Sequence, residues 1–148
     1  MKLRTFTDYS LRVLIHVASA PDGRATIAGI ARAFEISESH LVKVVHLLGR
    51  EGFLLNTRGR GGGLQLARPA AEIDVAQVVR AAEGGDEPAE CFRGAGNRCV
   101  IAPVCMLSGI LAEAMEAFYD VLGKYTLADL VANRGALEAI LHRLPTAA

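Results

Sequence analysis

Long hydrophobic runs are missing from this chain of 148 residues. No apolar stretch approaches the roughly 18–20 residues that a membrane-spanning helix requires. The first ten residues, MKLRTFTDYS, lack the hydrophobic core of a signal peptide. A nucleophile–base constellation is also missing, because the four histidines are scattered over unrelated segments. We therefore expect a cytoplasmic protein that has no membrane partner and is not an enzyme.

Cysteine is scarce, and all three cysteines (Cys91, Cys99 and Cys105) lie within 15 residues, in the segment ECFRGAGNRCVIAPVCML. The reducing cytoplasm argues against a disulfide framework and favours metal binding or redox chemistry. Three thiolates suit an iron–sulfur cluster or zinc, and both usually need a fourth donor. Position 108 is Ser108 and no histidine is near, so a carboxylate or thiol of a partner chain is a candidate. Cysteines can also simply pack as small hydrophobic residues. We favour the cluster because the whole cysteine content lies in one loop.

A net charge of one sign is absent overall, but the two halves of the chain differ. Residues 1–68 contain ten lysines and arginines against five aspartates and glutamates, a net charge of +5. Residues 69–148 contain six against eleven, a net charge of −5. A basic half joined to an acidic half is typical of a nucleic-acid-binding module with a separate regulatory part.

The basic half predicts a helix-turn-helix. The sequence predicts a first helix that opens at residues 5–8, where Thr5 or Thr7 can cap it, and that runs to Ala20. A second helix starts at Thr26, and a third begins at Ser37 or Glu38. In such a pair the second helix enters the major groove of DNA. We expect the polar residues near the start of the third helix to contact base edges or phosphates: Ser37, Ser39, His40 and Lys43.

A β-hairpin is predicted next, with alternating residues 53–57 and 63–67 as its strands. Its tip is basic and glycine-rich and contains Arg58, Arg60, Gly61 and Gly62, which suit a phosphate or a narrow minor groove. The tip lacks the GxxxxGK[ST] pattern of a nucleotide-binding loop. The fold class is therefore mainly α, a winged helix-turn-helix with a small β-hairpin wing.

Three regions follow from these patterns. Residues 1–84 form the DNA-binding domain, residues 85–106 the cysteine loop, and residues 107–148 a dimerisation helix with a helical tail. The dimerisation helix is predicted from apolar residues that repeat at three and four positions over about 20 residues. A stripe of that length often packs against a second copy of the chain.

The sequence resembles the bacterial iron–sulfur winged-helix regulators that include NsrR, IscR and RirA, and the NsrR type most of all. The resemblance covers nearly the whole chain and is carried by LRTFTDYSLRVLIHVA, RGRGGGLQLA, CVIAPVCML and EAFYDVLGKYTLADLV. It implies a homodimeric repressor of genes that detoxify nitric oxide. The cluster-bound dimer would bind double-stranded operator DNA and release it when nitric oxide nitrosylates the cluster.

The resemblance also implies a ligand set. Cys91, Cys99 and Cys105 would hold a [4Fe–4S] cluster, with Asp8 of the partner subunit as fourth ligand and Arg12 beside it. Asp8 and Arg12 are four residues apart and lie on one helix face, so an ordinary salt bridge is the alternative for this pair.

Two departures keep alternatives open. The seven residues between the first two cysteines are more than the four or five expected in this family, so a [2Fe–2S] cluster stays possible. Ser108 stands where IscR-like members have a histidine, which argues against that branch. A regulator that responds to iron or cluster supply, an iron–sulfur electron-transfer protein and a zinc-stabilised DNA-binding protein are the other functions considered.

Overall fold

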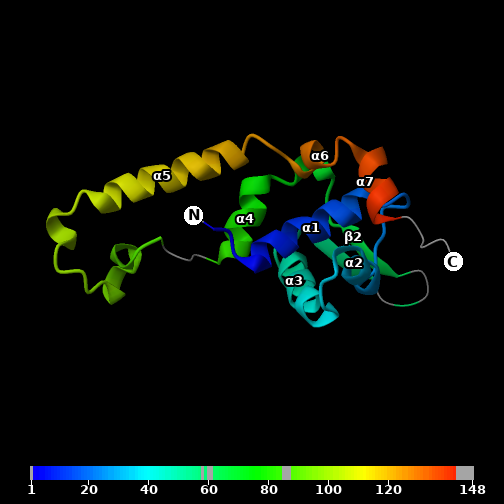
Figure 1. Ribbon diagram of the computed structural model, residues 1–148, viewed down its shortest axis with the longest axis horizontal. Coiled ribbons are helices and arrows are strands. Elements are labelled where there is room, and N and C mark those ends of the chain that lie inside the picture. The colour runs from blue at the N-terminus through cyan, green and yellow to red at the C-terminus, as the bar shows by residue number, and fades with distance from the viewer. Residues whose placement is uncertain (1, 58, 60–61, 85–87, 143–148) are drawn as a thin grey trace.

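The computed structural model describes residues 2–57, 59, 62–84 and 88–142 (Figure 1). The helices are α1 (Thr5–Ser19), α2 (Ile27–Phe34), α3 (Glu38–Arg50), α4 (Val75–Glu83), α5 (Leu107–Leu122), α6 (Leu127–Leu130) and α7 (Arg134–Leu141). The strands are β1 (Leu54–Thr57) and β2 (Gly63–Leu66). Short 3-10 turns are η1 (Ala70–Glu72), η2 (Glu90–Phe92), η3 (Gly94–Gly96) and η4 (Ala102–Val104). None of the helices in this part of the chain is long and apolar enough to cross a membrane.

Helix α1 lies at the centre of the main body and packs against α3, α4, α7 and β2. One continuous core results, and its fully buried side chains come from α1, α2, α3, α4, α6, both strands and the segment around Ile73. Burying one such aliphatic side chain stabilises the fold by about 1.5–3 kcal/mol. The predicted winged helix-turn-helix is therefore confirmed as the organising unit of the chain.

The helix-turn-helix has local causes. The Thr26 side chain accepts a hydrogen bond from the backbone N–H of Gly29 at 3.0 Å and so caps α2, as predicted. Glu35 ends α2 in the left-handed conformation, with φ of 54°, and Ile36 enters the core. The chain then turns into α3, whose N-cap is Ser37, although that side chain makes no capping hydrogen bond.

The start of α1 differs from the sequence prediction. Thr5 and Thr7 were expected to cap this helix, but the N-cap position is Arg4 and no side chain caps it. Thr7 is fully buried and donates its hydroxyl proton to the Glu83 carboxylate at the end of α4. The same carboxylate accepts the backbone N–H of Arg4 at 3.0 Å. Contacts between residues 4–7 and Glu83 therefore tie the start of α1 to the end of α4.

The predicted wing is confirmed as an antiparallel hairpin, in which Leu54 pairs with Leu66 and Thr57 with Gly63. An isolated bridge between Ala25 and Leu64 extends it toward the α1–α2 turn. The wing is thus anchored to the helix-turn-helix through backbone hydrogen bonds as well as through the buried Leu64 side chain.

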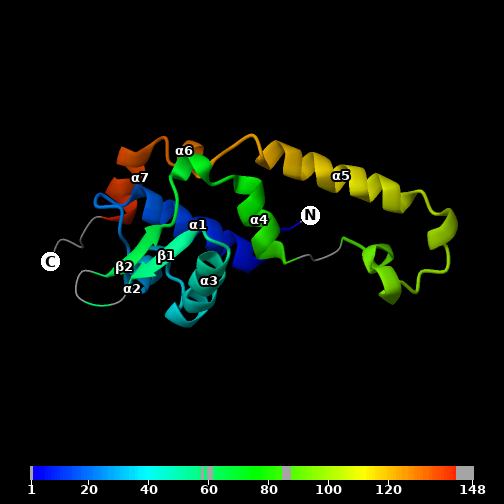
Figure 2. The same ribbon diagram turned by 180° about the vertical axis from the view of Figure 1, so that it is seen from behind.

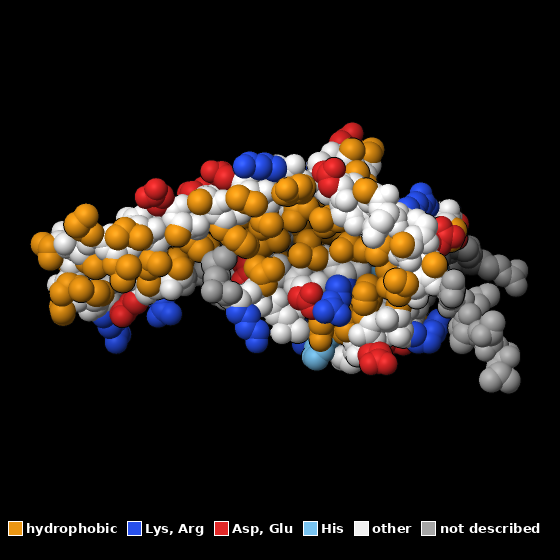
Figure 3. Space-filling view, turned by 45° about the horizontal axis from the view of Figure 1, so that its top comes forward, with side chains coloured by type: hydrophobic (Ala, Val, Ile, Leu, Met, Phe, Trp, Pro, Cys, Tyr) orange, Lys and Arg blue, Asp and Glu red, His pale blue; other side chains and the backbone are white. Residues whose placement is uncertain are grey.

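Helix α5 projects from the main body as an arm that carries the cysteine loop at its far end, and both views agree (Figures 1 and 2). None of its residues is buried. Its 16 residues correspond to about 24 Å, shorter than the predicted 20, because the helix ends where Gly123 follows Leu122. Figure 3 shows hydrophobic side chains gathered along the arm and over the centre of the same face.

The last helices return to the main body. Thr126 and Asp129 form a capping box that starts α6, and Leu127 enters the core. Helix α7 packs against α1, and Arg134 donates to the carbonyl oxygen of Ala20 at 2.6 Å. The described part of residues 107–148 is therefore both an arm and a cover for α1.

Candidate nucleic-acid interface and cysteine loop

Helix α3 presents a polar face to solvent. Its buried face consists of Leu41, Val44, Val45 and Leu48. The four residues of α3 and its N-cap that the sequence singled out for DNA contact are all exposed: Ser37, Ser39, His40 and Lys43. The hydroxyls at positions 37 and 39 lie 3.3 Å apart. This face can therefore approach DNA without any rearrangement of the core.

His40 and Val42 lie on opposite flanks of this exposed face of α3. The His40 ring lies against Tyr9, with centroids 6.4 Å apart, so His40 sits at the edge of α3 next to α1. Val42 is 52% exposed on the other flank and was not among the predicted contact residues. The signal was in the sequence, because Val42 does not fit the 41, 44, 45, 48 repeat of the buried face.

The wing tip can be located only in part. Gly62 lies just before β2, next to the Ala25 bridge. Arg58, Arg60 and Gly61, which were predicted to contact DNA, lie outside the described residues.

The three cysteines lie on the loop at the end of the arm. Cys91 is in η2, Cys99 precedes η4 and Cys105 follows it. Each is a free thiol and partly exposed. Residues 2–57, 59, 62–84 and 88–142 hold no group of three or more His, Cys, Asp and Glu side chains placed to share a metal ion. That Cys91, Cys99 and Cys105 share one metal group therefore stays a prediction.

The described turns of the cysteine loop are held mainly by local contacts. Its described turns bury no residue and are held by near-neighbour hydrogen bonds, such as Cys99 N–H to Asn97 Oδ1 at 2.9 Å and Ser108 Oγ to the Cys105 carbonyl at 3.3 Å. Val100 is 92% exposed at the tip. The donor set itself, three accessible thiols and no competing disulfide, suits a soft metal group.

Asp8 and Arg12 form the salt bridge that their spacing indicates, with 2.9 Å between Arg12 Nη2 and Asp8 Oδ2. The guanidinium also lies over the Phe34 ring, 5.6 Å from its centroid. Both side chains are partly exposed. The cysteine loop of the same chain lies away from them, beyond α4 at the far end of the arm (Figure 2).

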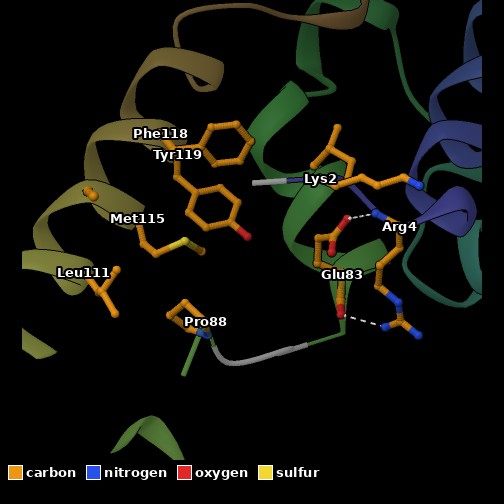
Figure 4. Close-up of a pocket in the computed structure, with 10 residues that line it drawn as sticks. Lys2, Arg4, Glu83, Pro88, Leu111, Met115, Phe118 and Tyr119 are labelled. Atoms are coloured by element: carbon orange, nitrogen blue, oxygen red, sulfur yellow. Dashed lines mark hydrogen bonds between the residues drawn. The ribbon is translucent and has the colours of Figure 1, made fainter. Parts of the chain in front are cut away.

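A cavity of about 570 Å³ separates the arm from the main body. Met115, Phe118 and Tyr119 of α5 line one side, and Lys2 and Arg4 line the other (Figure 4). Sequence reasoning missed this hollow because its walls are more than 100 residues apart. Arg80 bridges the two sides, with its guanidinium 3.7 Å from the Tyr119 ring centroid and 3.3 Å from Glu116 Oε2.

Comparison with known proteins agrees with this geometry. A family model described as Rrf2, iron-dependent transcriptional regulator, matches residues 3–133. The HTH-type transcriptional regulator NsrR of Geobacillus kaustophilus is 46% identical over 142 residues, which cover 95% of this chain and 97% of that protein. NsrR of Bacillus subtilis is 45% identical over 142 residues, which again cover 95% of this chain and 97% of that protein.

Solved structures show the same fold. The oxidised form of Staphylococcus aureus CymR matches with a TM-score of 0.69 and 27% identity, over 88% of this chain and 95% of that one. IscR of T. potens matches with a TM-score of 0.72 and 24% identity, over 94% of this chain and 90% of that one. At this identity the likeness shows the fold alone. With an exposed recognition helix, a hairpin wing and a family match over residues 3–133, the chain belongs to the Rrf2 family of winged-helix transcriptional regulators.

Proposed function

We propose that this regulator is a homodimeric repressor that releases operator DNA in response to nitric oxide. In this proposal an iron–sulfur cluster is held by Cys91, Cys99 and Cys105 with Asp8 of the partner subunit, and a [4Fe–4S] form is preferred over [2Fe–2S]. The observation that carries the proposal is the exposed arm: three thiols at its end and no fully buried residue in α5. Relatives at 45–46% identity that carry the name NsrR support nitric oxide as the signal.

The arm supports the dimer on physical grounds. Helix α5 has 16 residues and none of them is fully buried, so much of its apolar face is exposed to water, from which a second copy would remove it. Ile110 and Val121 are each more than half exposed on it. A dimer also fits operator binding, since two recognition helices then read two half-sites.

The thiols support the cofactor through their chemistry. Each is partly exposed, and the described turns around them bury no residue, so the loop can adjust its conformation around a bound group without disturbing the core. When bound, the cluster supplies iron atoms with which nitric oxide reacts. The carboxylate of Asp8 is a harder and weaker donor to iron than a thiolate, so it marks the labile position of the ligand set. Arg12, 2.9 Å from Asp8, orients that carboxylate.

Iron supply is the second candidate signal, and the family description as iron-dependent favours it. The two signals use the same residues and differ in what removes the cofactor. Iron depletion alone would then release the operator without nitric oxide.

The test is the visible spectrum and the iron and sulfide content of anaerobically purified protein, followed by a gel shift on promoter DNA during a nitric oxide titration. We expect a coloured protein that bleaches at stoichiometric nitric oxide and loses the shifted band. A colourless zinc protein whose DNA binding ignores nitric oxide would refute the proposal. Retention of the band with nitric oxide and its loss with an iron chelator would assign the iron signal instead.

Asp8→Ala tests the ligand across subunits. This variant should lose cluster absorbance faster than wild type, whereas Asp22→Ala, an exposed aspartate in the α1–α2 turn, should not. Unchanged absorbance and nitric oxide response in Asp8→Ala would remove Asp8 from the ligand set.

A further inference from the structure

One apolar side chain interrupts the polar outward face of α3. Val42 is 52% exposed, whereas its aliphatic neighbours Leu41 and Val44 are both fully buried. Residues three and four apart lie on the same face of a helix. Val42 therefore shares its face with Ser39 and His46, which are both exposed.

The fold gives Val42 no packing role, since it belongs neither to the core nor to the residues packed against it. A β-branched residue is also a weaker helix former than alanine. Scattered exposed apolar residues are ordinary on protein surfaces. What distinguishes this one is its place, as the fifth residue of the helix that a helix-turn-helix inserts into the major groove.

The chemical groups that the major groove presents limit which base Val42 can contact favourably. A valine side chain has no hydrogen-bond donor or acceptor, so it gains nothing from the polar edges of guanine, cytosine or adenine. The C5 methyl group of thymine is the apolar group that the major groove presents. We propose that Val42 contacts a thymine methyl in each operator half-site and so selects an A·T pair at one position. The inference rests on the proposed DNA-binding function and deepens it.

The neighbouring residues are consistent with this division of roles. Ser39 and Lys43 supply the donors that base edges and phosphates accept, and both are exposed beside Val42. Van der Waals contact with a methyl group adds discrimination at a position that these polar side chains do not read.

The experiment removes the methyl group from the DNA. A binding site is first selected from a random-sequence duplex pool with the cofactor-loaded full chain, and each thymine of the site is then replaced singly by deoxyuridine. Wild type should lose affinity about fourfold at one thymine in each half-site, the worth of one buried methyl group. Val42→Ala should bind thymine and uracil equally at that position. Ile140→Ala, a 77% exposed aliphatic residue of α7, should keep the wild-type penalty and serves as the matched control.

Two outcomes would overturn the inference. One is a wild-type protein that tolerates uracil at every position, and the other is a Val42→Ala variant that keeps the full penalty. Val42→Thr, which retains one of the two methyl groups, should show an intermediate penalty. A wild-type protein that selects no sequence at all would instead refute the proposed function, and the inference with it.

Discussion

Gly63 occupies a position in the fold at which any side chain should be destabilising. It begins β2 with φ of +152°, a value that side chains other than glycine rarely adopt. A Cβ atom there would lie 2.8 Å from the carbonyl oxygen of Ala25. That oxygen accepts the Leu64 N–H at 2.8 Å, and Ala25 N–H donates back to the Leu64 carbonyl at 3.0 Å. Gly63→Ala therefore strains the backbone and displaces the bridge that anchors the wing.

The magnitude follows from two contributions. Forcing a side chain into a sparsely populated conformation costs about 1–3 kcal/mol. Loosening two backbone hydrogen bonds adds about 1 kcal/mol. We expect Gly63→Ala to lower the free energy of unfolding by about 2–4 kcal/mol, which corresponds to a fall in Tm of roughly 6–12 °C for a chain of this size. DNA affinity should fall as well, because the wing loses its attachment to the helix-turn-helix.

Thermal unfolding followed by circular dichroism measures this directly. Gly135→Ala is the matched control, because a Cβ atom at this exposed position of α7 meets no other atom within 4 Å. Its Tm should equal or slightly exceed that of wild type, since alanine favours a helix over glycine. A Gly63→Ala variant within about 2 °C of wild type would show that the approach of Ala25 imposes no constraint on residue 63.

Three further predictions follow. Burial, and next the neighbouring His142, lower the pKa of His16 to about 4, so the unfolded chain takes up a proton that the folded chain excludes. Stability should be complete above about pH 6.5 and fall by about 2–3 kcal/mol toward pH 4; urea titrations should show this slope in wild type and much less of it in His16→Phe. Arg60→Ala should weaken DNA binding and reduce the slope of log affinity against log salt by about one, and an unchanged slope would exclude a phosphate contact. Thr126→Ala breaks the capping box with Asp129 and should cost about 1 kcal/mol in the same titrations; a neutral effect would mean that α6 needs no cap.

Local signals in the sequence predicted most of the winged helix correctly. The Thr26 cap, the apolar repeat at Leu41, Val44 and Leu48, and the glycine-rich hairpin all act within a few residues. The Thr126 cap of α6 is equally local, because its partner Asp129 lies three residues away. Each of these features depends on chain neighbours, so periodicity and capping rules suffice to find them.

Features made by distant residues escaped prediction. Thr7 looked like a helix cap, but its partner Glu83 is 76 residues away. Likewise, Lys2 and Arg4 line one cavity together with Met115, which is more than 100 residues away in the sequence. The spacing of residues in the sequence predicts contacts between chain neighbours. It carries little information about which distant carboxylate or aromatic ring a side chain will contact.

The cysteine loop differs from both cases. Three cysteines within 15 residues indicate a common ligand, and the described residues of one chain do not group them at a metal site. Metal binding normally supplies the energy that orders the ligands of such a site. Spacing therefore identifies the candidate ligands, whereas their arrangement depends on the bound group as well as on the chain.

Glu83 gives the molecule a mechanical link between its two ends. Arg80, one turn earlier in α4, lies against Tyr119 and Glu116 of the arm, and Glu83 itself holds the start of α1. Helix α1 packs in turn on α3. The arm and the recognition helix are therefore connected through α4 and α1, which contact each other by hydrogen bonds and close packing. Close-packed elements transmit displacements because they have few voids in which to absorb them. Asp8 lies one turn into the same helix, so, if it is a ligand as proposed, one helix would connect the cofactor site with the element on which the recognition helix packs.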